Sequence, residues 1–141
     1  MRSAAKILVV EDNEMLLALL GRALGREGYE VIPAPSGVAM MKVLYASKPD
    51  LVVLDVGLPD VDGHDLLAAL KKDPRTRAIP VLVWSGGGTE ADRRIALELG
   101  AEDYVRKGPP ATLVARIQRV FYRLDERDIA AARASAPPRA G

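Results

Sequence analysis

Four short apolar runs in the chain end in polar residues that together could bind a metal ion and a phosphoryl group. Each run is typical of a buried strand, and functional sites in open α/β sheets form outside the carboxyl ends of the strands. Carboxylates, a hydroxyl and an ammonium would gather at that edge, where oxygen ligands suit Mg²⁺. The residues are Glu11 and Asp12, Asp55, Ser85 and Lys107, which follow or end the runs 7–10, 51–54, 81–84 and 104–105.

Taken singly, most of these residues have ordinary interpretations as well. Acids are favoured in the first turn of a helix, most lysines are solvated, and a serine before three glycines could begin a turn. Asp55 differs, because it ends a wholly apolar strand and must find a partner or lie at the sheet edge. Complementary groups at all four strand ends favour one shared site. The glycines at 86–88 would also let backbone N–H groups approach an anion.

The elements that position these residues alternate along the chain, with apolar strands followed by amphipathic helices. This pattern is typical of βαβ units around a parallel sheet. We therefore predict an α/β fold, a three-layer (βα)5 doubly wound sandwich with a five-stranded parallel sheet. The predicted strands are 6–10, 29–33, 51–55, 80–84 and 103–106, and the predicted helices are 13–27, 36–47 (with Ser36 as N-cap), 64–73, 89–99 and 110–124.

Length and composition narrow the class of protein. The 141 residues suit one ordinary domain, and the lack of cysteine together with a single histidine excludes thiolate and multi-histidine metal sites. A net charge of +1 does not indicate direct nucleic-acid binding. No apolar run approaches a membrane span, and the N-terminus lacks a signal-peptide core. We expect a cytoplasmic protein with no membrane partner.

The last part of the chain is expected to differ from the rest. We predict one domain over residues 1–124, followed at 125–141 by a C-terminal helical extension and flexible tail. The alanines at 130–132 favour continuation of the last helix, whereas residues 134–141 have little to bury.

Four stretches of the chain resemble the receiver domain of two-component response regulators, over residues 5 to about 124. The most specific is the stretch LDVGLPDVDG at 54–63, in which Pro59 and Gly63 take their usual places. The resemblance implies a stand-alone receiver with a flavodoxin-like fold and strand order 2-1-3-4-5. The other stretches are 7–13, 79–85 and 103–107.

This resemblance implies that Asp55 is the phosphoacceptor. Its carboxylate would take a phosphoryl group from a phosphohistidine on a sensor histidine kinase or a histidine phosphotransfer protein. Asp12, Asp55 and the Gly57 carbonyl would bind Mg²⁺ directly, and Glu11 would bind it through water. The cation would offset charge on the transferred group, where the barrier is largely electrostatic.

The resemblance also implies a switch. Ser85, the Gly86 N–H and Lys107 would contact the phosphoryl oxygens, and the movement of Ser85 would open space for Tyr104 to rotate inward. The face formed by the elements at 89–99, 103–106 and 110–124 would then change and bind a downstream protein target. Homodimerisation through that face stays an open alternative. The chain would be a signalling switch and not an enzyme, although it would phosphorylate and slowly dephosphorylate itself.

Three glycines depart from the family pattern. Lys107 precedes Gly108 where most receivers have a proline after a cis bond, so we expect a trans bond with an altered loop or a cis bond tolerated by glycine. Gly57 and Gly87 lack the side chains that often shield the phosphoryl group in relatives, so we expect that group to be open to attacking water or to a phosphatase. The alternative is a degenerate receiver acting as an unphosphorylated interaction module. A phosphatase is excluded, since Gly57 stands where such an enzyme needs its general acid.

Overall fold

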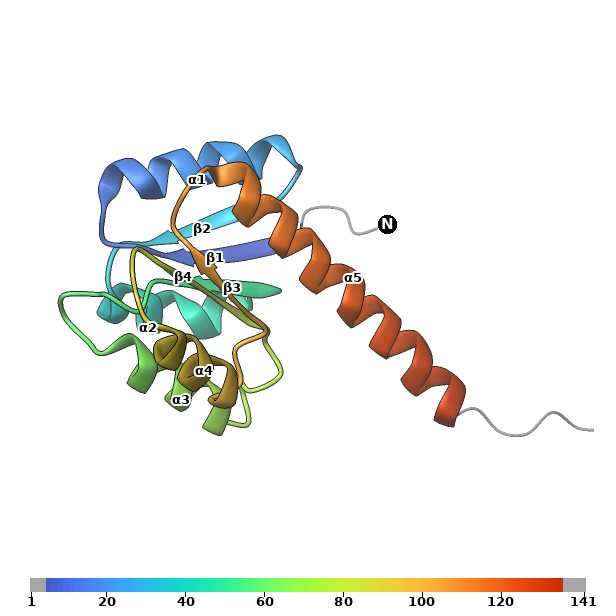
Figure 1. The fold of residues 1–141 in the computed structure, drawn as a ribbon. Helices are drawn as coiled ribbons and strands as arrows, with labels where there is room; N and C mark the ends of the chain where they lie inside the picture. The colour runs from blue at the N-terminus through green and yellow to red at the C-terminus, as the bar shows by residue number, and fades with distance from the viewer. Residues whose placement is uncertain (1–4, 136–141) are drawn as a thin grey trace, which may run out of the picture.

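Five parallel strands form the central sheet of the computed structural model, which describes the backbone of residues 5–135 and the side chains of residues 5–127. The strand order is β2-β1-β3-β4-β5, as predicted, and neighbouring strands pair in parallel throughout (Figure 1). The strands are β1 (Lys6–Val10), β2 (Glu30–Ala34), β3 (Leu51–Leu54), β4 (Val81–Ser85) and β5 (Asp103–Arg106).

Helices cover both faces of the sheet in the described part of the chain. Helices α1 and α5 lie on one face, and α2, α3 and α4 lie on the other (Figure 1). The predicted boundaries differ from the observed ones by at most one residue, except at the end of α5. The helices are α1 (Glu14–Arg26), α2 (Gly37–Ser47), α3 (Gly63–Lys72), α4 (Glu90–Glu98) and α5 (Pro110–Ser135).

Two hydrophobic clusters, one on each face of the sheet, hold these layers together. Leu20, Leu24 and Ile117 pack beneath α1 and α5, and Met40 and Leu67 pack beneath α2 and α3. Strands β3 and β4 are buried at every position, which is why their sequences are apolar except for Ser85 at the end of β4. Polar side chains are therefore confined to the strand ends, where the loops begin.

Each of the first four helices starts with a side-chain cap at the carboxyl edge of the sheet. Asn13, Ser36, Asp62 and Thr89 accept hydrogen bonds from backbone N–H groups in the first turns of α1, α2, α3 and α4. The prediction of Ser36 as an N-cap is confirmed. The caps bind N–H groups that a helix leaves unpaired, so each helix begins within a few residues of a strand end.

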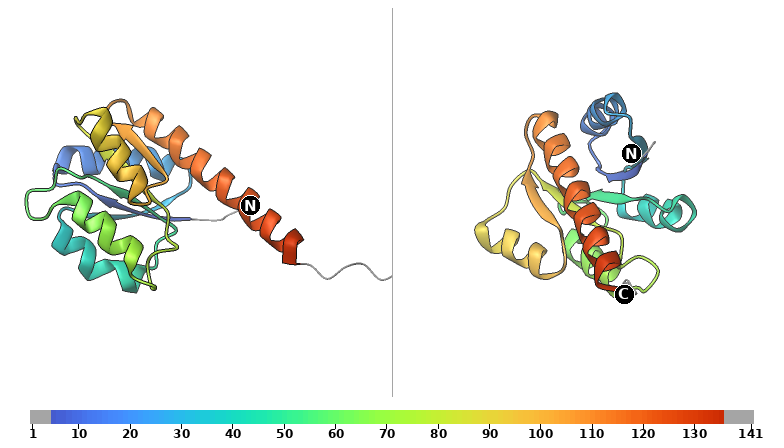
Figure 2. Two further views of the ribbon diagram at one scale, coloured as in Figure 1. Left: turned by 60° about the horizontal axis from the view of Figure 1, so that its bottom comes forward. Right: turned by 90° about the vertical axis from the view of Figure 1, so that its right-hand side faces the viewer.

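Helix α5 continues well past the predicted end at residue 124 and runs to Ser135. The predicted helical extension is therefore present, and it projects beyond the sheet (Figure 2). Arg127 ties its beginning to the body through Glu102, with 3.3 Å between Nη1 and Oε1. The predicted flexible tail lies mostly at 136–141, outside the described residues. Within 5–135, no helix is both long and apolar enough to cross a membrane.

Candidate phosphoryl-transfer site

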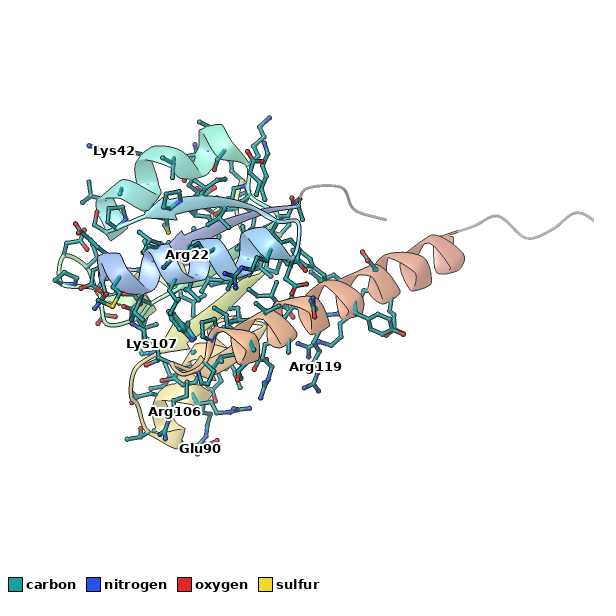
Figure 3. The ribbon with its side chains drawn as sticks, turned by 90° about the horizontal axis from the view of Figure 1, so that it is seen from above. Arg22, Lys42, Glu90, Arg106, Lys107 and Arg119 are labelled. Atoms are coloured by element: carbon teal, nitrogen blue, oxygen red, sulfur yellow. The ribbon has the colours of Figure 1, made fainter. Side chains whose placement is uncertain are left out.

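The carboxyl edge of the sheet brings together all but one of the predicted site residues. They line a hollow of about 430 Å³ between the ends of β1, β3, β4 and β5. Lys107 lies at this end of the molecule, away from the projecting part of α5 (Figure 3). Tyr104 is the exception and lines a neighbouring hollow instead. The residues in the main hollow are Glu11, Asp12, Asp55, Gly57, Ser85, Gly86 and Lys107.

Lys107 joins two carboxylates across the hollow. Its Nζ lies 2.5 Å from Glu11 Oε1 and 3.1 Å from Asp55 Oδ2. Burial alone would lower the pKa of Lys107, but the bonds to Glu11 and Asp55 outweigh burial and raise that pKa. The Nζ also lies 5.3 Å from the centre of the buried Trp84 ring. Lys107 is therefore a charged ammonium that contacts Asp55.

Glu11 is fully buried, which is unusual for a glutamate. Its Oε2 accepts a hydrogen bond from the Asn13 N–H at 2.9 Å. Burial raises the pKa of Glu11, and the nearby charge of Asp55 raises it further. Lys107 and the Asn13 N–H act in the opposite direction. The carboxylate is thus held by a hydrogen bond from Asn13 and an ion pair with Lys107, although its burial penalises the charge.

Asp55 sits directly after β3, with its side chain almost wholly buried. Its backbone N–H donates to the Val10 carbonyl at 3.0 Å, and its Oδ1 accepts from the Gly57 N–H at 2.8 Å. The other oxygen of Asp55, Oδ2, accepts a hydrogen bond from the Lys107 ammonium. Asp55 therefore has a fixed orientation, facing the hollow at the middle of the sheet edge.

The donor set fits a divalent cation. One oxygen from each of Glu11, Asp12 and Asp55 can be chosen so that all three lie within 4.8 Å of one another. Lys107 offsets only part of their combined charge, and like charges this close repel unless a cation lies between them. Three carboxylates without nitrogen or sulfur donors are typical ligands of Mg²⁺.

The Lys107–Gly108 bond is trans, because the described residues contain no cis peptide bond. Of the two expected geometries, the retained cis bond is wrong. The Lys107 N–H donates to the Ser85 carbonyl at 2.7 Å, which continues the β4–β5 pairing to the edge of the sheet. This bond brings Lys107 to the hollow without a following proline.

Ser85 and Tyr104 share one acceptor, the carbonyl oxygen of Gly87. The Ser85 hydroxyl donates to it at 2.7 Å and the Tyr104 hydroxyl at 3.0 Å. Gly88 has a φ of +115°, and a Cβ atom there would overlap the Tyr104 hydroxyl, so the close approach depends on glycine. The two predicted switch residues are therefore linked through one loop carbonyl.

Several contributors escaped the sequence analysis. The Gly87 carbonyl carries no side-chain signal, whereas Asn13 could have been identified as a cap preceding a helical run. Gly63 packs so tightly against the Val56 backbone that a Cβ atom would overlap it, which explains this glycine of the motif. Asp60 bonds to the start of α2, a contact between segments that no local pattern reveals.

Comparison with known proteins assigns the chain to a family. Fold and site define a doubly wound α/β protein with an acidic sheet edge, and the family model of the response regulator receiver domain matches residues 7–118. The chain belongs to the response regulator receiver family. A putative response regulator from Chloroflexus aurantiacus has a similar structure, with a TM-score of 0.77 and 31% identity, over 83% of this chain and 97% of that one.

Curated relatives are similar over the receiver region only. The chain is 40% identical over 119 residues to the alkaline phosphatase synthesis transcriptional regulatory protein PhoP of Bacillus subtilis, covering 84% of this chain and 49% of that protein. The BeF3-activated receiver domain of Klebsiella pneumoniae RstA has a TM-score of 0.73 and 33% identity, over 80% of this chain and 95% of that one. The chain spans about half the length of the curated relatives it matches.

Proposed function

We propose that the chain accepts a phosphoryl group from a phosphohistidine onto Asp55 and then acts as a signalling switch. The observation that carries this proposal is the contact between Lys107 Nζ and Asp55 Oδ2 at 3.1 Å, within a hollow lined by Glu11 and Asp12. An oxygen of Asp55 would bond to phosphorus as the phosphorus–nitrogen bond breaks. The released imidazole keeps the electron pair and takes up a proton. The chain would be a switch and not an enzyme with a separate substrate.

The metal ligands in this proposal are Asp12, Asp55 and the Gly57 carbonyl, with Glu11 acting through water. A bound Mg²⁺ would offset negative charge on the transferred group. The chain's own contribution is orientation, because the Gly57 N–H and Lys107 already fix the Asp55 carboxylate. The Ser85 hydroxyl, the Gly86 N–H and the Lys107 ammonium would hold the phosphoryl oxygens.

The shared Gly87 carbonyl supports a route from Asp55 to the surface. Turning the Ser85 hydroxyl toward a phosphoryl oxygen would remove one of the two donors from that carbonyl. Tyr104 would then be the remaining side-chain donor, and its position would follow the loop. We propose that this change alters the face formed by α4, β5 and α5, and that the kinase and the downstream target meet the chain in the cytoplasm.

That face carries arginines available for a protein partner. Arg94, Arg106 and Arg119 are exposed, and within residues 5–127 none of them has an ion-pair partner. Arg106 and Arg119 lie on the same outer side of the molecule (Figure 3). A homodimer could use the same arginines, so the oligomeric state belongs to the tests of this proposal.

Intact-mass analysis after incubation with acetyl phosphate and Mg²⁺ tests the proposal, with Asp55→Asn as the control. We expect a single phosphoryl adduct on the unaltered chain, and none on Asp55→Asn or in the presence of a chelator. Failure to form or trap an adduct on the unaltered chain would contradict the proposal. The chain would then be a receiver that works as an unphosphorylated interaction module.

A further inference from the structure

The loop that follows Asp55 is tied to helix α2 by a carboxylate. Asp60 Oδ1 accepts a hydrogen bond from the Gly37 N–H, and Asp60 Oδ2 accepts one from the Val38 N–H, both at 3.1 Å. One side chain thus bonds to the first two N–H groups of α2. These groups have no partner inside the helix, so the contact satisfies donors that the helix cannot satisfy itself.

Packing reinforces this connection. A Cβ atom on Gly37 would overlap the Val61 side chain, so glycine permits the loop to approach the start of α2. Val61 itself packs against the cluster beneath α2 and α3. Two consecutive residues of the loop, Asp60 and Val61, are therefore held at the same end of the same helix.

The charge of Asp60 suits its position. The first turn of α2 contains no acidic residue, although a negative charge there would be favourable. The Val38 and Gly37 N–H groups lower the pKa of Asp60, which stays ionised at neutral pH. Asp60 is exposed, so burial does not explain its place. Its carboxylate supplies from a distant segment the charge that α2 lacks.

The held segment begins at the candidate metal site. Gly57 lies between Asp55, which accepts from its N–H at 2.8 Å, and Asp60, three residues later. Leu58, in between, is buried. The Gly57 peptide is thus part of a short segment fixed at both ends, and fixed supports of metal ligands commonly set metal affinity.

We propose that Asp60 is a positioning residue, which holds the loop carrying Gly57 against α2 and thereby sets the Mg²⁺ affinity of the site. This inference rests on the proposed function, because it takes the Gly57 carbonyl as a metal ligand. Asp60 does not touch the metal or the phosphoryl group in this account. It acts only through the geometry of residues 57–60.

Calorimetric titration with MgCl₂ provides the test, using Asp60→Ala, Asp60→Asn and Ser36→Ala. Ser36→Ala is the matched control: it removes another cap of α2, the Ser36 Oγ acceptor of the Ala39 N–H, without touching the loop. We expect Asp60→Ala to weaken Mg²⁺ binding about tenfold. Asp60→Asn, which retains one acceptor oxygen, should have a smaller effect. Ser36→Ala should change binding by less than about twofold, while lowering the melting temperature as much as Asp60→Ala.

Hydrogen exchange without Mg²⁺ gives an independent readout. Asp60→Ala should speed exchange of the Gly57, Gly37 and Val38 amides, whereas Ser36→Ala should speed exchange at Ala39 and leave Gly57 unchanged. Equal losses of Mg²⁺ affinity in Asp60→Ala and Ser36→Ala would reduce Asp60 to a helix cap and overturn the inference. If the unaltered chain and Asp60→Ala both bind Mg²⁺ with the same affinity, the inference about Asp60 is overturned and the proposed function is not. Absence of Mg²⁺ binding by the unaltered chain would overturn the proposed function as well.

Discussion

Two clusters in this molecule combine a cation, carboxylate and aromatic ring, yet their environments differ. At the sheet edge, Lys107 bonds to Glu11 and Asp55 and lies 5.3 Å from the Trp84 ring centre. Away from that edge, a second cluster contains an arginine 4.3 Å from a tyrosine ring centre and 2.9 Å from an aspartate oxygen. Its members are Arg75, Asp73 and Tyr45.

Charge balance separates the two clusters. In the exposed cluster one cation meets one carboxylate, and Asp73 also accepts from the Tyr45 hydroxyl at 2.9 Å. At the sheet edge one ammonium meets two buried carboxylates, with Asp12 close by. In the exposed cluster the two charges balance, so no further ion is needed, and the contacts tie α2 to the end of α3. The sheet edge has an excess of buried negative charge, which indicates a site that needs another cation.

The largest contrast is expected from removing each cation. Lys107→Ala should slow phosphoryl incorporation from acetyl phosphate about 100-fold, because a preorganised positive charge at the reacting oxygens is lost. Arg75→Ala should leave that rate unchanged and lower the melting temperature by less than about 2 °C. Time-resolved intact-mass analysis and thermal denaturation measure these effects. An unchanged rate in Lys107→Ala would remove the proposed difference between the clusters.

A second contrast concerns access of water to the sheet-edge site. A Cβ atom on Gly87 would meet no atom within 4 Å, so a larger side chain has room beside the hollow. Gly87→Leu should lengthen the half-life of phosphorylated Asp55 about fivefold by excluding water. Gly25→Leu, on α1 with similar free space, is the matched control and should leave the half-life unchanged. Decay of the radiolabelled protein measures it, and a phosphoform that is already very long-lived would contradict the prediction.

The smallest contrast is in stability, and it has opposite signs in the two clusters. The pKa of Glu11 is raised, chiefly by burial, so its ionisation costs folding free energy at neutral pH. Glu11→Gln should therefore raise the melting temperature of the Mg²⁺-free protein by about 3 °C. The pKa of Asp73 is lowered, chiefly by hydrogen bonds from Arg75, so Asp73→Asn should lower the melting temperature slightly.

As the pH falls, the melting-temperature change caused by Glu11→Gln should disappear before the change caused by Asp73→Asn. The advantage of Glu11→Gln shrinks as the pH falls through the raised pKa of Glu11, and it is gone below the ordinary glutamate value. The deficit of Asp73→Asn persists to lower pH, because the stabilisation from Asp73 is lost only as the pH falls through its lowered pKa. Melting temperatures from pH 3 to pH 8 test this order, and equal signs at neutral pH would contradict the comparison.

Local signals in the chain were sufficient for most elements. Alternating strands and helices predicted the (βα)5 layers, and the resemblance to receiver domains implied the strand order that the structure has. The continuation of α5 past residue 124 was expected as a helical extension, and its end at Ser135 fits a sequence with no glycine or proline between residue 124 and that point. The residues after 124 still favour a helix, but they lack the regular apolar spacing by which a helix boundary is predicted from sequence.

Side-chain partners at the site were less accessible to sequence analysis. Lys107, Glu11 and Asp55 were expected at one edge, but the hydrogen bond from the Lys107 N–H to the Ser85 carbonyl became visible only in the structure. The shared acceptor of Ser85 and Tyr104 is a backbone oxygen, which no residue type encodes. The Asp60 contact joins segments more than twenty residues apart and left no periodic signal.

The sequence by itself determined which chemical groups stand at the strand ends, because apolar runs and turn residues set where each strand stops. It thereby determined the acidic edge and the family. Only the tertiary structure decided how those groups pair: that Glu11 is buried beneath Lys107, that Gly87 serves two hydroxyls, and that Asp60 caps a distant helix. The physical reason is that strand formation depends on neighbours along the chain, whereas burial, charge balance and capping between segments depend on neighbours in space.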